Sequence, residues 1–327
     1  MDKSKKASRK RRSRKRKIAI RNTLGVVAIL IVVLIGVGAL NRDKINADEI
    51  DKEVINNQGT SVIDNDDVSK EDKDNDESDE NVNTATNKQE LVYTSYENDL
   101  YADNAKDVES MLNKWNYLRE DGKKIAYLTF DDGPSTEVTG QILETLKENN
   151  VKATFFVLGS NVEKSDKQKE LLKEMVMEGH AIGNHGYCHD YSILYPGRVA
   201  DTTAFMNDMK KSEEVMKSVL GDDFSTKVIR FPGGHMSWNT KSLDPILEQE
   251  GYSYIDWNTL NGDAESNGRT TEQLISRLQG SVSDLAGNDD VLVILMHDTN
   301  AKEATAQSLQ ETINYLKSLG YEFRTLK

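Results

Sequence analysis

From Lys124 onward, short apolar runs rich in β-branched residues alternate with longer stretches that carry apolar residues at helical spacing. The runs are typical of buried strands and the stretches of amphipathic helices. Regular alternation of the two predicts an α/β fold of parallel strands joined by helical crossovers. Seven strands fit either an incomplete TIM-like barrel or a doubly wound sheet. The predicted strands are Ile125–Phe130, Ala153–Leu158, Ala181–Asn184, Val228–Phe231, Tyr252–Trp257, Val291–Met296 and Tyr321–Leu326. The predicted helices are Glu137–Glu148, Glu163–Glu178, Ala200–Leu220, Lys241–Gln249, Thr271–Leu278 and Ala304–Leu319.

The first quarter of the chain differs from the rest in composition. All 22 aromatic residues lie at or after Tyr93, so the residues before it have no aromatic core. Residues 1–42 carry 13 Lys or Arg and one acid, whereas residues 43–90 carry 16 acids and five lysines. We therefore expect one folded domain at 123–327, preceded by a helical N-terminal extension at 93–122.

An uncharged apolar run occupies residues 24–40. As a helix it would be about 26 Å long, near the short limit for crossing a bilayer. The basic tail at 1–23 would stay in the cytoplasm, which predicts a single-pass membrane anchor with the folded domain outside the cell. Residues 41–92 would form a disordered acidic stalk. The alternative is a secreted protein whose signal peptide is cleaved near the small residues at 37–39.

Charge and cysteine content exclude several classes of protein. Residues 91–327 carry a net charge of −14, which argues against a nucleic-acid partner because phosphate would be repelled. The single cysteine excludes an intramolecular disulfide and a zinc site of four thiolates. We expect a monomer that binds no nucleic acid.

Chemically reactive side chains follow the predicted strands. The carboxyl ends of parallel strands open on one face, where such folds place active sites. For the adjacent aspartates after the first strand, a helix N-cap or an Asp-Gly turn is the alternative interpretation. The residues at or just beyond strand ends are Asp131, Asp132, His185, Arg230, Asp256, Asp263 and His297.

A histidine pair predicts a metal site. His185 and His189 are four residues apart, a spacing that would put both imidazoles on one face of a helical turn. With Asp132 they would make a three-ligand site with an open position, suited to Zn²⁺ and also to Co²⁺, Ni²⁺ or Fe²⁺. A pair of solvent-facing histidines is the alternative. Cys188 lies between them and is expected to be a packed or free thiol.

Four stretches together resemble the polysaccharide deacetylase family, the NodB-homology domain of carbohydrate esterase family 4. They are Thr129–Pro134, His185–His189, Arg230–Gly234 and Leu295–Asp298, in the family's order. The resemblance covers roughly Lys124–Lys327. It implies a distorted (β/α) barrel of seven or eight strands and a divalent metal, usually zinc. It also implies removal of N-acetyl groups, sometimes O-acetyl groups, from a glycan.

The resemblance also implies a role for each matching residue. The metal would polarise the acetyl carbonyl and bind the attacking water, and a protonated imidazole would release the amine. The implied roles are general base for Asp131, metal ligand for Asp132, His185 and His189, orientation of the base for Arg230, oxyanion stabilisation by the amide of Gly233, and general acid for His297.

Two departures from the family pattern concern the surroundings of the sugar. A further family motif, which lies between the last two of these stretches, usually reads Asp-Trp, but here Asp263 precedes an alanine and an Asp-Trp pair begins earlier, at Asp256. We expect Asp263 to keep His297 protonated, with Asp256 as the alternative. The third motif usually has an aromatic residue at the position of Gly233, so one wall of a substrate groove is expected to be wider. His235 is a candidate groove residue.

The resulting hypothesis is a membrane-tethered deacetylase of N-acetylglucosamine in cell-wall peptidoglycan. An exported polysaccharide or a chitin-like oligomer is the alternative substrate. A non-catalytic glycan-binding module on a stalk is the alternative of a different class. A pure binder needs no acid and base, so the presence of both Asp131 and His297 argues against it.

Overall fold

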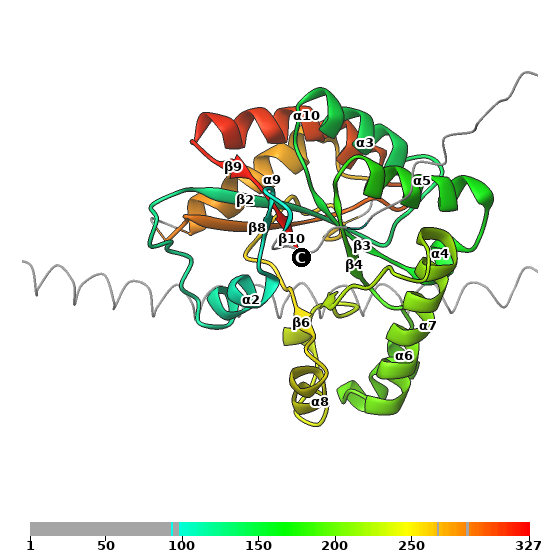
Figure 1. Cartoon of the computed structure of the whole chain (residues 1–327). Helices are drawn as coiled ribbons and strands as arrows, with labels where there is room; N and C mark the ends of the chain where they lie inside the picture. The colour runs from blue at the N-terminus through cyan, green and yellow to red at the C-terminus, as the bar shows by residue number, and fades with distance from the viewer. Residues whose placement is uncertain (1–92, 94–97, 267, 286–287) are drawn as a thin grey trace, which may run out of the picture. The chain divides into compact units, whose positions relative to one another are not determined.

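The structure, a computed structural model, describes Tyr93 and residues 98–266, 268–285 and 288–327 (Figure 1). The predicted basic tail, membrane anchor and acidic stalk lie outside these residues. Within the described part of the chain, no helix combines the length and the apolar character needed to cross a membrane.

A curled parallel sheet lies at the centre of the domain (Figure 1). Its strands are β2 (Ile125–Asp131), β3 (Thr154–Val157), β4 (Ala181–Asn184), β5 (Val228–Ile229), β6 (Ser253–Tyr254), β7 (Thr259–Leu260), β8 (Val291–His297) and β9 (Glu322–Phe323). The spatial order is β6-β5-β4-β3-β2-β8-β7, and β9 pairs with the start of β2. From β2 to β6, each crossover leads to the neighbouring strand in the same direction, and β7 leads to its neighbour β8, as in a barrel and not in a doubly wound sheet. No ladder joins β6 to β7 in the described residues, so the α/β fold is confirmed as an open half-barrel.

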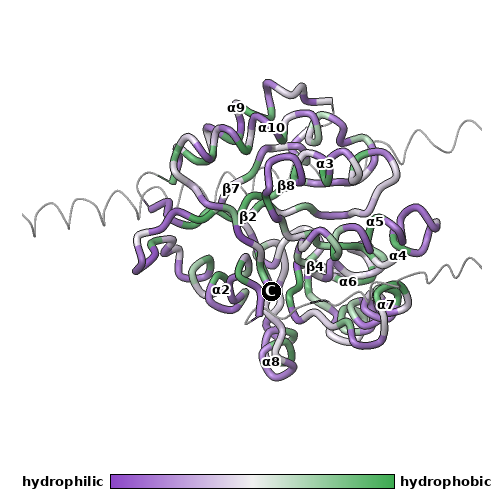
Figure 2. Tube along the Cα trace, turned by 45° about the horizontal axis from the view of Figure 1, so that its top comes forward, coloured by the Kyte–Doolittle hydropathy of each residue, from purple (hydrophilic) through white to green (hydrophobic). Residues whose placement is uncertain are grey.

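Helices cover the outside of the sheet. They are α3 (Thr139–Glu148), α4 (Gly159–Val162), α5 (Asp166–Met177), α6 (Tyr191–Leu194), α7 (Thr202–Leu220), α8 (Asp244–Gln249), α9 (Thr271–Asp284) and α10 (Glu303–Ser318). Helix α10 packs between α9 and α3, and α5 contacts α3 and α7. Figure 2 shows hydrophobic residues along the central strands and mixed hydropathy along the helices. The main core therefore lies between the sheet and the helices, built from side chains such as Leu128, Phe155, Ile294 and Leu309.

Three predicted elements differ in the structure: the strand at 252–257 and the helix at 163–178 are shorter, and the strand at 321–326 is divided into β9 and β10 (Thr325–Leu326). The run at 252–257 forms only β6, and β7 follows after a short break that the sequence pattern did not indicate. In that break the Asn258 side chain bonds the carbonyl of Val291 and the amide of Val293, each at 2.8 Å. The Asn258 side chain thus makes hydrogen bonds to the backbone of β8 at the point where β7 has not yet begun. The helix predicted at 163–178 forms α5 alone, and α4 ends before the predicted start.

The segment before the sheet is part of the domain. Strand β1 (Ala102–Asp103) pairs in parallel with β10 (Thr325–Leu326) at the C-terminus. Helix α2 (Ala105–Asn113) starts at Asn104, whose side chain accepts a hydrogen bond from the amide of Lys106. One face of α2 is buried against the sheet, and α3 and α10 cover the other side of the sheet (Figure 1). The helical spacing in this segment therefore reflects packing against the domain.

Replacement of Leu112 by alanine tests this packing. Leu112 is buried on α2, whereas Leu118, a few residues later, is 49% exposed. We expect Leu112→Ala to lower the free energy of unfolding in urea by about 2–4 kcal/mol, because a buried cavity is left behind. Leu118→Ala should change it by less than about 0.5 kcal/mol. Equal effects of the two substitutions would show that α2 lies outside the cooperative unit.

Candidate active site

The carboxyl end of the sheet gathers the predicted site residues. Asp131 is the last residue of β2 and His297 the last residue of β8, and the two are register partners on neighbouring strands. His185 follows β4 directly, and Arg230 follows β5. Strand order therefore brings together residues that are more than 160 positions apart in the sequence.

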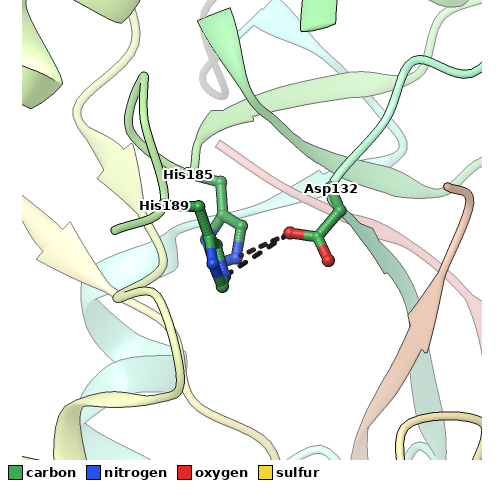
Figure 3. Close-up of side chains that lie close together, drawn as sticks. All are labelled: Asp132, His185 and His189. Atoms are coloured by element: carbon green, nitrogen blue, oxygen red, sulfur yellow. Dashed lines mark ion pairs between the residues drawn. The ribbon is translucent and has the colours of Figure 1, made fainter. Parts of the chain in front are cut away.

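Three potential ligand atoms converge beside Asp131. Asp132, His185 and His189 each offer one ligand atom, and these atoms lie within 4.8 Å of one another. The Oδ1 atom of Asp132 is 3.5 Å from Nε2 of His185 and 3.6 Å from Nε2 of His189 (Figure 3). This Oδ1 atom is buried and has no hydrogen-bond partner. Asp132 also has a left-handed backbone, with φ of 72°, a strained conformation that is typical of functional sites.

The prediction that the two histidines share a helical turn is wrong. The segment after β4 is a loop in which Gly186 and His189 both have left-handed backbones, with φ of 86° and 52°. The Asp208 carboxylate, on α7, accepts hydrogen bonds from the amides of Tyr187 and Cys188 at 2.7 and 3.1 Å. This loop geometry, and not helical periodicity, directs both imidazoles toward the same carboxylate. The Cys188 thiol is free and does not belong to the ligand cluster.

The chemistry of these three donors fits a divalent transition metal. The Nδ1–H of His185 donates to the carbonyl of Arg230 at 2.8 Å, so its Nε2 carries a lone pair toward Asp132. Burial lowers the pKa of His185 to about 3, which keeps the imidazole neutral. Two imidazole lone pairs and a carboxylate oxygen repel one another unless a cation lies among them. Nitrogen and oxygen donors in this number suit Zn²⁺ and its neighbours in the first transition row.

Asp131 is held by a buried arginine. The Nη1 atom of Arg230 donates to Oδ1 of Asp131 and to the hydroxyl of Thr129, both at 2.7 Å, and its Nε donates to the carbonyl of Ile255 at 2.7 Å. Arg230 is fully buried. Burial raises the pKa of Asp131 above its usual range, and Arg230 opposes this rise. The arginine therefore orients a carboxylate whose burial favours proton uptake.

His297 is paired with Asp263. The Nδ1 atom of His297 lies 2.8 Å from Oδ1 of Asp263, and its backbone amide donates to Oδ2 of the same carboxylate at 2.8 Å. Burial alone would lower the pKa of His297, but the charge and hydrogen bond of Asp263, together with the charges of Asp132 and Asp131, raise this pKa to about 9. Asp256, the alternative partner, instead accepts hydrogen bonds from the amides of His235 and Met236.

The remaining candidates lie around this centre. Gly233 has φ of 78° and lies in the loop after β5. The His235 ring stacks on Tyr254, with centroids 4.0 Å apart, and its Nε2 lies 2.9 Å from Oδ1 of Asp244. These contacts hold the His235 ring against Tyr254 and Asp244, so His235 has a structural role. It does not belong to the ligand cluster.

Asp298 is a buried group that the sequence did not single out. Its Oδ2 atom accepts a hydrogen bond from the Thr139 hydroxyl at 2.7 Å, and its carboxylate contacts the position that any side chain at Gly133 would occupy. Burial raises the pKa of Asp298 to about 7. A glycine is therefore required beside Asp132, and the turn that carries this ligand is packed against the end of β8. The sequence feature that could have indicated Asp298 is its position directly after His297.

Comparison with known proteins agrees with this geometry. Residues 119–255 match the family described as polysaccharide deacetylase. A peptidoglycan-N-acetylglucosamine deacetylase of Bacillus cereus is 32% identical over 214 residues, which cover 65% of this chain and 73% of the relative. A chitin deacetylase of Colletotrichum lindemuthianum is 33% identical over 205 residues, 61% of this chain and 76% of the relative. The structure of a CE4 esterase of Streptococcus mutans superimposes with a TM-score of 0.63 at 39% identity, covering 69% of this chain and 92% of that one. The chain belongs to the polysaccharide deacetylase family.

Removal of the buried arginine should destabilise the domain. Arg230→Met would leave the Asp131 carboxylate buried without its partner, and we expect the free energy of unfolding to fall by about 3–5 kcal/mol. The matched control is Arg198→Met, because Arg198 is exposed. Arg198→Met should change the free energy of unfolding by less than about 1 kcal/mol. Urea unfolding of both variants measures the difference, and a cost no larger for Arg230 than for Arg198 would contradict the buried ion pair.

Proposed function

We propose that this protein is a metal-dependent deacetylase that hydrolyses the N-acetyl groups of N-acetylglucosamine in peptidoglycan, releasing acetate and a free amine. The observation that carries the proposal is the pairing of the ligand cluster with a separate base and acid, Asp131 and His297, on adjacent strands. The B. cereus relative is named for this substrate and supports the choice. The fungal relative, named for chitin, keeps a chitin-like oligomer as the alternative.

Asp132, His185 and His189 would hold the metal, for which Zn²⁺ is our first choice. A divalent cation at this place supplies Lewis acidity that polarises an amide carbonyl and makes water more acidic. The hydrogen bond from His185 to the carbonyl of Arg230 would fix the orientation of that ligand.

The other residues divide the proton transfers between them. Asp131, held by Arg230, accepts a proton from the attacking water as its oxygen bonds to the acetyl carbon. The amide of Gly233 donates to the carbonyl oxygen as negative charge develops there. His297, kept protonated by Asp263, donates its proton to the amine nitrogen as the carbon–nitrogen bond breaks. Amide hydrolysis needs this last step because an unprotonated amine is a poor leaving group.

We propose further that the enzyme works outside the cell, held at the membrane by residues 24–40. The apolar run and the basic residues before it support this location. A tethered catalytic domain would suit an insoluble substrate that lies next to the membrane.

Acetate release from soluble peptidoglycan glycan strands tests the activity. With Zn²⁺ added, we expect equal amounts of acetate and free amine, and loss of both after chelation. Asp132→Asn should lower the rate more than about 100-fold, beyond the range found for residues that only orient a ligand. Asp166→Asn, at a side chain that is 96% exposed, should have no effect.

The outcomes of this assay separate the alternatives. Faster turnover of an N-acetylglucosamine pentamer than of the peptidoglycan strands would favour a chitin-like substrate. Binding of either glycan without acetate release would favour the non-catalytic module and contradict the proposal.

The pH dependence of the rate tests the assignment of the acid. His297 must be protonated, so activity should be present below its pKa of about 9 and be lost as the pH rises through that value. Asp263→Asn removes the charge that raises this pKa while burial, which lowers it, remains. We therefore expect the alkaline limb of kcat/KM to move down by about two pH units or more, to near or below the ordinary histidine value of about 6.5.

The matched control is Asp256→Asn, which should leave the alkaline limb near pH 9 because Asp256 does not contact His297. If the alkaline limb moves in the Asp256 variant and stays in the Asp263 variant, Asp256 and not Asp263 is the residue that keeps His297 protonated.

A further inference from the structure

Tyr191 lies beside the ligand cluster. It is the first residue of α6, and its ring centroid lies 5.2 Å from that of His189 and 5.0 Å from that of Trp238. The residue is 36% exposed, and its hydroxyl has no hydrogen-bond partner among the described residues. The ring is thus fixed on both sides while its O–H group remains available to a ligand.

The hydroxyl of Tyr191 lies over Gly233. A Cβ atom at Gly233 would come within 3.1 Å of the Tyr191 hydroxyl oxygen and 3.2 Å of the Trp238 ring. The space where residue 233 would have its side chain is therefore taken by an aromatic residue from α6. Among the described residues, the backbone N–H of Gly233 also has no hydrogen-bond partner. Two unused donors consequently lie close together at the edge of the ligand cluster.

Unused donors that are held in place by packing are the feature that stabilises negative charge on a substrate oxygen. We propose that the Tyr191 hydroxyl is a catalytic residue that donates a hydrogen bond to the acetyl carbonyl oxygen in the transition state, beside the amide of Gly233. This inference rests on the proposed deacetylase activity. The water oxygen bonds to the carbonyl carbon, the C=O π pair moves to the oxygen, and Tyr191 donates to that oxygen without losing its proton.

The neighbouring Tyr195 provides a matched comparison. It belongs to the same aromatic group, and its ring stacks on Trp238 with centroids 4.1 Å apart. Its hydroxyl is also unpartnered, but it is buried and the residue is only 2% exposed. A buried hydroxyl of this kind cannot reach a substrate, so its removal should not change the chemistry.

Tyr191→Phe and Tyr195→Phe, each in the full-length protein loaded with Zn²⁺, test the inference. Both substitutions keep the ring, so the contacts with His189 and Trp238 should stay. On soluble peptidoglycan glycan strands we expect Tyr191→Phe to lower kcat by about 100-fold, the effect of losing one such donor, with KM unchanged within twofold. Tyr195→Phe should match the wild type in both constants. Zinc content per chain should be the same in all three proteins.

Three results would overturn the inference. An unchanged kcat in Tyr191→Phe would show that the hydroxyl does not act in the transition state. A raised KM with kcat unchanged would make Tyr191 a contact to the sugar only, and a loss of zinc would show that it acts through His189. The activity of the wild type is measured in the same assay, so failure of the proposed function is seen separately, as absence of acetate from the wild-type protein.

Discussion

A buried carboxylate oxygen without a hydrogen-bond partner is the constraint on which the rest of this site depends. The Oδ1 atom of Asp132 lies among imidazole nitrogens of His185 and His189, at distances too long for hydrogen bonds. Such an arrangement is unfavourable unless a cation neutralises it. The strained backbone of Asp132 and the glycine after it, packed against Asp298, hold the oxygen in this place. The surrounding fold therefore holds together three donors that fit a metal ion.

Around this cluster, similar side chains acquire different properties from their surroundings. Burial lowers the pKa of His185 to about 3, although the nearby Asp132 carboxylate opposes this fall, and a neutral imidazole is what a ligand requires. His297 is also buried, but the Asp263 carboxylate raises its pKa to about 9, as a proton donor requires. Asp131 is held by Arg230, and Asp263 is held by His297 and the hydroxyl of Thr305. In the proposed mechanism the same residue types would thus serve as ligand, base and acid, because each has a different partner.

Much of this architecture could be predicted from the sequence, because strand and helix periods are local properties. The α/β class and most elements follow from them, and strand ends indicated the site residues. The loop from Gly186 to His189 could not be predicted, since its shape depends on Asp208 from a distant helix. The break before β7 depends on side-chain bonds of Asn258 to another strand. Tyr191 was missed for the same reason: its relation to Gly233 exists only in three dimensions.

The most direct test of the central claim is X-ray absorption spectroscopy at the zinc edge of the zinc-loaded protein. The account predicts one zinc per chain with two imidazole nitrogens at about 2.0–2.1 Å and oxygen ligands at about 2.0–2.2 Å. A His189→Ala variant should show one imidazole fewer, whereas His235→Ala should show the wild-type spectrum. A spectrum without imidazole scattering, or one unchanged in the His189 variant, would contradict the account.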